Sequence, residues 1–164
     1  MLKRTLAAGL VCILGSAASG QTKISGTSQC GKPDKAYVLP AGDRADHAFG
    51  LTKVKCTWPR PLQMAGVQLQ QDEITVLSEI HGKTSSDRSY VVGTLSNGDK
   101  LFVRPVGTAV LVDGRPQSSS GTWQYVGGTG KFANIRGRGT FRCRSNPNGT
   151  STCDIQGRYQ LPKG

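Results

Sequence analysis

The sequence predicts an all-β protein, and three observations point to that fold class. From about residue 37 onward, almost every segment shows the two-residue alternation of a β-strand, and no segment carries a convincing 3.6-residue helical stripe. Glycine-rich turns separate these segments, and the chain holds 22 glycines. Asn97-Gly98 separates two β-rich runs, which is the pattern of a β-hairpin. Seven to nine short strands of this kind predict an antiparallel barrel or sandwich.

The N-terminal 20 residues have the pattern of a secretory signal peptide. Two basic residues precede an apolar run over residues 6–14, and small residues follow it. The run is too short to span a bilayer as a mature helix, and we expect no transmembrane segment elsewhere. We therefore expect an exported protein, periplasmic or secreted. The predicted organisation is a signal peptide over residues 1–20, a loose N-terminal arm over residues 21–34 and a single β domain over residues 35–164.

The chain is strongly basic. Its 21 Lys and Arg against 10 Asp and Glu give a formal net charge of +11, and loss of a leader that holds two of the basic residues leaves 19 against 10, or +9. Such a charge favours anionic partners such as acidic polysaccharide, nucleic acid or lipid headgroups, with an attraction that salt weakens. A soluble basic surface without a dedicated partner explains the same composition.

The four cysteines beyond the leader predict two disulfide bonds, because an even number in an exported chain usually pairs. A zinc site is the alternative. No Cys-x-x-Cys occurs, however, and the two histidines, His47 and His81, have no ligand-like spacing. We therefore expect no metal and no cofactor. The four cysteines are Cys30, Cys56, Cys143 and Cys153.

Strands are predicted first over residues 47–58, 66–70 and 73–80. In the last of these, Ile74 and Val76 share one face, whereas Glu73 and Glu79 share the other. The two glutamates are carboxylates on a central strand, and exposure on the outer face is the expected state of a strand glutamate.

A β-hairpin is predicted around Asn97-Gly98. Asn-Gly readily adopts the positive φ angles of a two-residue type I′ turn, whose twist matches the flanking strands. This turn would pair Ser96 with Asp99, Thr94 with Leu101 and Val92 with Val103. Further strands follow over residues 107–112 and 121–126, on either side of a turn at residues 113–116.

The stretch GGTGKFANIRGRGTF, residues 127–141, has the composition of a phosphate-binding loop. A Walker A loop needs a glycine five residues before its Gly-Lys pair and a hydroxyl after it, but Tyr125 and Phe132 occupy those positions. The dinucleotide pattern is met over residues 128–133, yet it works only where the turn opens a helix. Residues 135–143 alternate as a strand instead. We therefore expect a tight turn that leads into a bent strand.

The last two strands have a predicted register. If Cys143 faces Cys153, one face of the pair is apolar and glycine-rich, and Arg142 meets Asp154 on the other face. Glycines on the inner face let strands bend, with a ring such as Tyr159 covering the gap above Gly137; alternatively, they leave space for a ligand. The register also pairs Phe141 with Ile155, Gly139 with Gly157, Gly137 with Tyr159 and Ile135 with Leu161.

Three stretches together resemble a known family. YVVGTLSNGDKLFVRPVGTAVLVDG, GTWQYVGGTGKFANIRGRGTFRC and GRYQLP are similar to the bacterial branch of the allene oxide cyclase barrel-like proteins, whose plant relatives include allene oxide cyclases and dirigent proteins. The resemblance covers residues 88–162. It implies an eight-stranded antiparallel β-barrel with an apolar interior, used in the family to steer oxylipins or phenoxy radicals. The family's cavity acids and arginines do not align residue by residue with this chain.

Two sets of residues are candidate sites. Four aromatic residues are expected to line a ligand cavity or simply to fill the core, and five arginines are expected to form an anion-binding strand face or a solvated one. No catalytic set stands out, since no Ser-His-Asp spacing or activated cysteine occurs. The aromatic set is Tyr90, Trp123, Tyr125 and Tyr159, and the arginine set is Arg136, Arg138, Arg142, Arg144 and Arg158.

The function expected from the sequence is binding of a small apolar or amphipathic ligand without catalysis. One alternative is a cyclase or isomerase of the allene oxide cyclase type, which requires an inward-facing carboxylate. The other is an interaction protein that uses the arginine face to dock on an anionic polymer or lipid surface. Sequence-specific nucleic-acid recognition is not expected, because few aromatic residues accompany the arginines.

Overall fold

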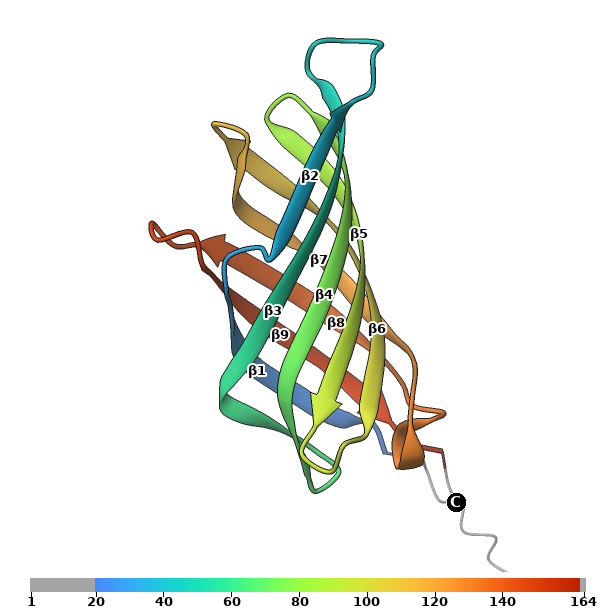
Figure 1. Cartoon of the computed structure of the whole chain (residues 1–164). Helices are drawn as coiled ribbons and strands as arrows, with labels where there is room; N and C mark the ends of the chain where they lie inside the picture. Colours follow the sequence, from blue (N-terminus) through green and yellow to red (C-terminus); the bar gives the residue numbers. More distant parts are fainter. Residues whose placement is uncertain (1–19, 163–164) are drawn as a thin grey trace, which may run out of the picture.

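The computed structural model describes residues 20–162, which form a closed barrel of eight antiparallel strands with a ninth strand outside it (Figure 1). The predicted all-β fold class and eight-stranded barrel are confirmed. The predicted signal peptide lies outside the described residues, apart from Gly20. The strands are β1 (Thr22–Cys30), β2 (Lys35–Pro40), β3 (His47–Met64), β4 (Val67–His81), β5 (Thr84–Leu95), β6 (Lys100–Val112), β7 (Arg115–Gly128), β8 (Arg136–Ser145) and β9 (Ser151–Gln160).

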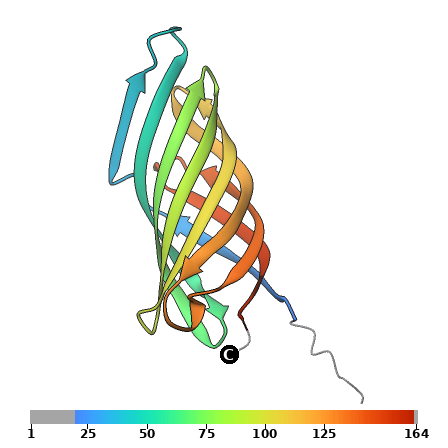
Figure 2. The same ribbon diagram turned by 90° about the vertical axis from the view of Figure 1, so that its right-hand side faces the viewer.

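The barrel is built by neighbours in sequence and closed by the two chain ends. Each strand from β3 to β9 pairs with the next, and β1 pairs with β9 over its whole length. Closure rests on only two residue pairs between β1 and β3, Gln29 with Thr57 and Cys30 with Cys56. The other half of β3 pairs with β2, which stands apart from the barrel wall as an edge strand (Figure 2).

The N-terminal segment differs from the loose arm expected over residues 21–34. Residues 22–30 form β1, and all nine of them pair with β9. Ile24, Ser28 and Cys30 are buried while the residues between them are mostly exposed or half-buried, so the segment has an inner and an outer face. Its Gly, Ser and Thr composition suggested a loop, but pairing with β9 along the whole segment overrides that local preference.

Strand β4 carries a bulge that changes which residues face inward. The predicted strands 66–70 and 73–80 are parts of this one strand, and its pairing with β5 shifts between Leu69 and Gln71. Leu69 is buried before the shift, whereas Asp72 and Ile74 face the interior after it. One extra residue exchanges the two faces of a strand, and here it brings an acidic residue into the barrel.

The β5–β6 turn is wider than predicted. The expected pairing of Thr94 with Leu101 is wrong, because Thr94 pairs with Lys100 and Val92 with Phe102. Ser96, which was expected opposite Asp99, lies beyond the last pair of this ladder. A type I′ turn needs positive φ at both central residues, but of Asn97 and Gly98 only the glycine has it, at 86°. The Asn97 side chain instead accepts a hydrogen bond from the backbone N–H of Asp99 at 3.2 Å.

The β8–β9 register is confirmed. It runs from Arg136 opposite Gln160 to Ser145 opposite Ser151, with Cys143 facing Cys153. The predicted Ile135–Leu161 pair lies just beyond this ladder.

Aromatic rings cover the glycines on the inner face of β8 and β9. A Cβ atom at Gly139 or Gly157 would overlap the indole ring of Trp123, and one at Gly137 would lie 3.0 Å from the Tyr125 ring. Tyr125 therefore covers Gly137, in place of the Tyr159 expected from the sequence. These glycines accommodate large side chains from β7, so they do not leave free space of their own.

The turn after β7 closes one end of the barrel. It contains a single 3₁₀ turn, Gly130–Phe132, and then leads into β8, as expected for a turn and not for a nucleotide-binding helix. Phe132 is fully buried, and Lys131 Nζ donates a hydrogen bond of 2.7 Å to the carbonyl oxygen of Ala65 in the β3–β4 turn. Buried Met64, Leu95 and Leu101 pack in the same core cluster, so this end is filled by side chains.

The two predicted disulfides form, between Cys30 and Cys56 and between Cys143 and Cys153. Disulfide bonds of this kind indicate an oxidising compartment. Among the described residues, no helix is long and apolar enough to cross a membrane.

Candidate ligand cavity

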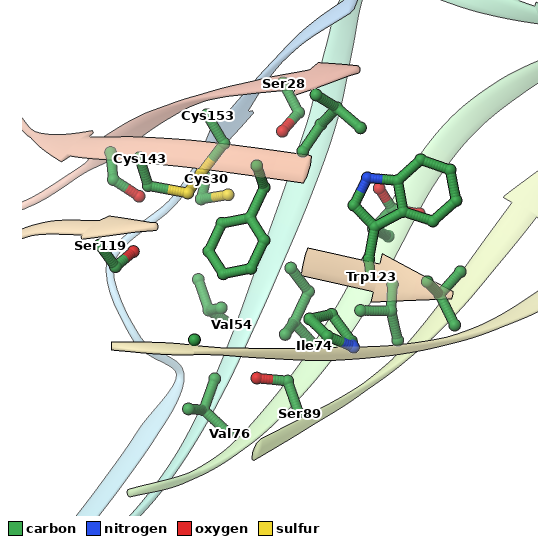
Figure 3. Close-up of a pocket in the computed structure, with 18 of the residues that line it drawn as sticks. Ser28, Cys30, Val54, Ile74, Val76, Ser89, Ser119, Trp123, Cys143 and Cys153 are labelled. Atoms are coloured by element: carbon green, nitrogen blue, oxygen red, sulfur yellow. A yellow bond between two sulfur atoms is a disulfide. The ribbon is translucent and has the colours of Figure 1, made fainter. Parts of the chain in front are cut away.

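The interior of the barrel contains a cavity of about 260 Å³ (Figure 3). Its walls come from β1 and from β3 to β9, because the inward-facing residues of each strand alternate with outward-facing ones. A dry apolar cavity of about 150 Å³ is known to hold benzene. The cavity of this barrel is therefore large enough for a bicyclic or comparably sized molecule.

The cavity is apolar over most of its length and polar toward one end. Side chains such as Val54, Ile74 and Val103 form the apolar wall, together with the Trp123 ring. Hydroxyl groups gather toward the end formed by the β6–β7 and β8–β9 turns. The serines that line the cavity are Ser28, Ser89, Ser118, Ser119, Ser145 and Ser151.

One carboxyl group lies in the apolar part of this cavity. Asp72 on β4 is 8% exposed, and the indole Nε1–H of Trp58 on β3 donates a hydrogen bond of 2.9 Å to its Oδ2. Burial raises the pKa of Asp72 to about 6, and the Trp58 hydrogen bond opposes that rise. Gly93 on β5 makes room for the group, because a Cβ atom there would lie 2.9 Å from Asp72 Oδ1.

Tyr125 adds its hydroxyl to the polar groups of the residues that line the cavity. Burial raises the pKa of its hydroxyl above the usual value, and the nearby Asp72 carboxylate adds to the rise. The hydroxyl therefore stays protonated at neutral pH and can donate a hydrogen bond. The contact the structure gives it is weak, since its oxygen lies 3.9 Å from Met64 Sδ.

The structure places the four predicted cavity aromatics in three different settings. Trp123 and Tyr125 line the cavity as expected. Tyr90 does not, because the inward positions of β5 are odd-numbered; it is 41% exposed and stacks on Phe102 outside the barrel. Tyr159 is buried in the core, where its hydroxyl accepts a hydrogen bond from the Ala65 backbone.

The carboxylates expected on β4 lie outside the barrel. Glu73 binds Lys53 Nζ at 3.0 Å with 40% of its side chain exposed, and Glu79 is also on the outer face, with 48% exposed. Asp72 and its partner Trp58 were not predicted as site residues, and neither was Asp87 on β5, a half-buried carboxyl group that also lines the cavity. The signal that could have found Asp72 is the polar run QLQQDE, which breaks the alternation at the bulge.

The five predicted surface arginines are all exposed on the outer face of β8 and β9. Arg138 lies directly opposite Arg158, and Arg142 lies opposite Asp154. Asp154 accepts a hydrogen bond of 2.7 Å from the Thr27 hydroxyl, and within residues 20–162 no ion pair joins it to Arg142. A groove beside this face is lined by further basic groups, Lys23 and Arg60.

The fold and the cavity define a class: a closed eight-stranded antiparallel β-barrel with a ligand-sized, mostly apolar interior and, within residues 20–162, one buried acid. No family model matches the sequence, and no curated protein matches it by sequence comparison. Solved structures match by fold. The pterocarpan synthase dirigent protein PsPTS1 aligns with a TM-score of 0.50 and 12% identity over 87% of this chain and 97% of that one.

Two further solved structures align with this chain. The pterocarpan synthase dirigent protein GePTS1 aligns with a TM-score of 0.50 and 13% identity over 88% of this chain and 87% of that one. A pyocyanin demethylase aligns with a TM-score of 0.46 and 15% identity over 81% of this chain and 98% of that one. At these identities the likeness to the two dirigent proteins shows the barrel fold alone.

Proposed function

We propose that the barrel binds a small, mostly apolar molecule that carries one hydrogen-bond donor or basic nitrogen, with Asp72 as its polar contact. The observation that carries this proposal is the apolar cavity of about 260 Å³ with a buried carboxyl group in its wall. A ring system of one or two cycles suits the volume.

The negative charge of ionised Asp72 determines which polar groups a ligand in the cavity can carry. Asp72 has a pKa of about 6, so at pH 7.5 it is mostly ionised, although it sits in an apolar wall. A ligand hydroxyl or ammonium group would satisfy the carboxylate, whereas a ligand carboxylate would face repulsion in a low-dielectric site. We therefore expect neutral or cationic ligands and exclusion of anionic ones.

The test compares three probes with the same ring system. 2-Naphthol, 2-methoxynaphthalene and 2-naphthoate are titrated at pH 7.5, while ¹H–¹⁵N NMR follows the indole N–H signals of Trp58 and Trp123. The naphthol should bind best and its methyl ether about tenfold less well, because a hydrogen bond to a charged group contributes roughly 1.5 kcal/mol or more. The naphthoate should bind least.

Two variants test whether Asp72 causes the preference for naphthol over naphthoate. Asp72→Asn should remove most of the preference for naphthol over naphthoate, whereas Glu73→Gln, which alters the adjacent exposed carboxylate, should leave it intact. If none of the probes moves either indole signal, the cavity does not take ligands of this class and the proposal fails.

A second candidate function is a cyclase or isomerase, and Asp72 is the observation that favours it. A carboxyl group with a pKa of about 6 can both donate and accept a proton near neutral pH. Incubation with an allene oxide generated in situ should then give a single product enantiomer with the wild type and a racemate with Asp72→Asn. A racemate from both proteins would remove this candidate.

A third candidate is binding of anionic polymers or membranes through the arginine face. Its support is the exposure of all five arginines and the absence, within residues 20–162, of an ion pair that neutralises Arg142. Replacing Arg136, Arg138, Arg142 and Arg144 with serine should abolish retention on heparin and on anionic vesicles. Unchanged retention would assign this face to solubility alone.

We also propose that the protein is exported and related to the bacterial allene oxide cyclase barrel-like proteins. The support is the two disulfides, the basic charge, the leader pattern and the barrel shared with dirigent proteins. Mass spectrometry of the protein secreted or released from cells should find a mature N-terminus close to residue 21.

A further inference from the structure

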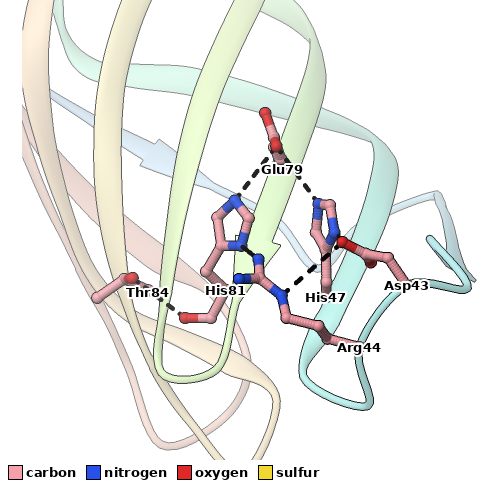
Figure 4. Close-up of polar contacts among 6 residues, drawn as sticks. All are labelled: Asp43, Arg44, His47, Glu79, His81 and Thr84. Atoms are coloured by element: carbon pink, nitrogen blue, oxygen red, sulfur yellow. Dashed lines mark hydrogen bonds and ion pairs between the residues drawn. The ribbon is translucent and has the colours of Figure 1, made fainter.

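Two histidines and a glutamate meet where β3 begins and β4 ends, on the outer face of the sheet (Figure 4). His47 and His81 are 34 positions apart in sequence but are directly paired across the two strands. His47 Nε2 lies 3.3 Å and His81 Nε2 3.2 Å from the same oxygen, Glu79 Oε1. The two imidazole rings stack, with centroids 4.4 Å apart.

Asp43 fixes the proton position on His47. Its Oδ1 lies 2.6 Å from His47 Nδ1. An ionised carboxylate only accepts hydrogen bonds, so Nδ1 carries the proton and the neutral ring leaves its lone pair on Nε2. This is the arrangement of a metal-binding histidine, whose second nitrogen usually donates to a carboxylate or carbonyl that sets the tautomer and the ring orientation.

The lone pair of His47 Nε2 has nothing to accept. The atom is shielded from solvent and makes no hydrogen bond within residues 20–162. Glu79 Oε1 at 3.3 Å is near enough, but the angle is not that of a hydrogen bond. In the neutral ring, an acceptor nitrogen thus faces an acceptor oxygen, and a cation between them would satisfy both.

We propose that His47, Glu79 and His81 form a binding site for a divalent ion of the zinc class, independent of the cavity inside the barrel. Zinc accepts imidazole nitrogen and carboxylate oxygen at about 2.0–2.2 Å in tetrahedral geometry, so its ligand atoms are about 3.4 Å apart. The two nitrogen–oxygen separations, 3.2 and 3.3 Å, match that spacing. Three protein ligands leave the fourth position to solvent or an outside group.

Arg44 competes with the metal for this site. Its Nη2 donates to His81 Nδ1 at 3.0 Å, which leaves the proton of the neutral His81 ring on Nε2, pointing at Glu79. Binding a metal through Nε2 moves that proton to Nδ1, and Arg44 must then withdraw. The Arg44 side chain is 59% exposed, so it can move into solvent. Metal affinity is therefore limited by Arg44, whose positive charge also repels the ion.

The competing explanation is a doubly protonated His47 held between Asp43 and Glu79 with no metal. In this explanation a proton on His47 Nε2 lies between His47 and Glu79, where the proposal places a metal ion. The two explanations differ in what happens to tag-free, disulfide-bonded protein that has been freed of metal with a chelator and then titrated with zinc chloride at pH 7.5. A metal site takes up one zinc ion per chain; an imidazolium cluster takes up none.

The experiment uses isothermal titration calorimetry with zinc chloride and, as a spectroscopic probe, the visible spectrum of added cobalt(II). The wild type should saturate at one ion per chain and show the intense cobalt bands of a tetrahedral site. His47→Gln and His81→Gln should weaken zinc binding by at least about 100-fold. Asp43→Asn, which removes only the orienting carboxylate, should weaken it by about 10–100-fold.

Two further variants separate this site from adventitious zinc. Glu73→Gln alters an exposed carboxylate on the same face of β4 and should bind zinc like the wild type, whereas Arg44→Gln should bind more tightly than the wild type. The proposal is overturned if the wild type takes up no zinc, if Glu73→Gln loses as much affinity as His47→Gln, or if ¹⁵N NMR shows His47 protonated on both nitrogens in the presence of zinc. None of these outcomes bears on the cavity.

Discussion

The indole nitrogen of Trp58 donates a hydrogen bond of 2.9 Å to the carboxyl group of Asp72 inside the barrel. Burial raises the pKa of Asp72 and this hydrogen bond lowers it; among residues 20–162 no cation contributes to the shift. The pair therefore places a carboxyl group with a pKa of about 6 in an apolar wall. A buried acid without a cationic partner reduces stability when ionised, and such groups cluster at functional sites.

Asp72→Asn should stabilise the protein at neutral pH but not in acid. The pKa of Asp72 is about 6 in the fold against an ordinary 3.8, so the fold favours the protonated form. The favourable contribution of Asp72 is complete below pH 4 and is lost as the pH rises to 6. Asn is never ionised, so its advantage should grow over that window to about 3 kcal/mol above pH 6. Urea unfolding of both proteins between pH 3.5 and pH 8 measures this difference in the free energy of unfolding.

Glu73→Gln is the matched control for this pH dependence. The hydrogen bond from Lys53 holds the pKa of Glu73 below its usual value, so its contribution is present at neutral pH and is lost as the pH falls. This variant should be less stable than the wild type at pH 7.5 and equal to it in acid. If both variants shifted stability with pH in the same direction, burial of Asp72 would not be the cause.

Gly139→Ala should destabilise the barrel. A Cβ atom at this position would overlap the Trp123 ring and the carbonyl oxygen of Gln156 on the paired strand. Overpacking of this kind typically costs about 1–3 kcal/mol, and here both neighbours are held by the sheet. Chemical unfolding and the near-ultraviolet circular dichroism of tryptophan should both report the change.

Gly50→Ala is the control for the glycine effect. Gly50 also lies within a strand, but a Cβ atom there would meet only ordinary contacts, the nearest being Ser78 Cβ at 3.5 Å. This variant should match or exceed the wild type in stability. Equal losses at both positions would mean that chain flexibility, not the packing of Trp123, explains the effect of Gly139→Ala.

The parts of the fold that sequence predicted well are those where two independent signals agree. Cysteines and apolar alternation gave the same β8–β9 register, and the structure has it. The prediction of the Asn97-Gly98 turn depended on the dipeptide alone, and the predicted register was wrong by one residue. Asp113-Gly114 meets the type I′ requirement, with φ angles of 50° and 71°. Dipeptide preference alone did not tell these two turns apart.

The candidate sites were harder to predict, because they depend on pairing between strands. Asp72 faces inward only because of the bulge before it, and strict alternation gives no hint of where a bulge falls. His47 and His81 meet only because β3 and β4 pair in one particular register. The arginines on β8 were predicted correctly as exposed, since a regular strand without a bulge keeps its alternation.

Removal of the Cys30–Cys56 disulfide should cost more stability than removal of Cys143–Cys153. The first links residues 26 positions apart and the second residues 10 apart. In the chain-entropy model these loops correspond to about 3.5 and 2.7 kcal/mol. The first bond also supports the two-pair junction between β1 and β3, whereas β8 and β9 share a long ladder.

Two double variants, Cys30→Ser/Cys56→Ser and Cys143→Ser/Cys153→Ser, test which disulfide contributes more stability, with urea unfolding as the measurement. The variant without Cys30–Cys56 should also lose amide protection in β1 first, as seen by hydrogen exchange, because closure of the barrel depends on that junction. Equal losses for the two disulfides, with β1 still protected, would show that pairing with β9 alone holds the N-terminal strand.

Trp58→Phe tests whether the indole hydrogen bond stabilises the ionised form of Asp72. The ring is nearly conserved, but the carboxylate loses the donor at 2.9 Å, so the pKa of Asp72 should rise above about 6. At pH 8 the variant loses a hydrogen bond to a charged group, which contributes about 1.5–3 kcal/mol; in an Asp72→Asn background it loses a neutral one, about 1 kcal/mol.

A double-mutant cycle isolates this difference from the packing lost with the indole. The packing term is common to both backgrounds and cancels, so the coupling between Trp58 and Asp72 should be about 1 kcal/mol at pH 8 and should shrink at pH 4, where the carboxyl group is protonated. A coupling that stays constant from pH 4 to pH 8 would mean that Asp72 does not ionise within the fold over this range. The carboxyl group would then meet a ligand as a hydrogen-bond donor, and the preference for naphthol over naphthoate should vanish with it.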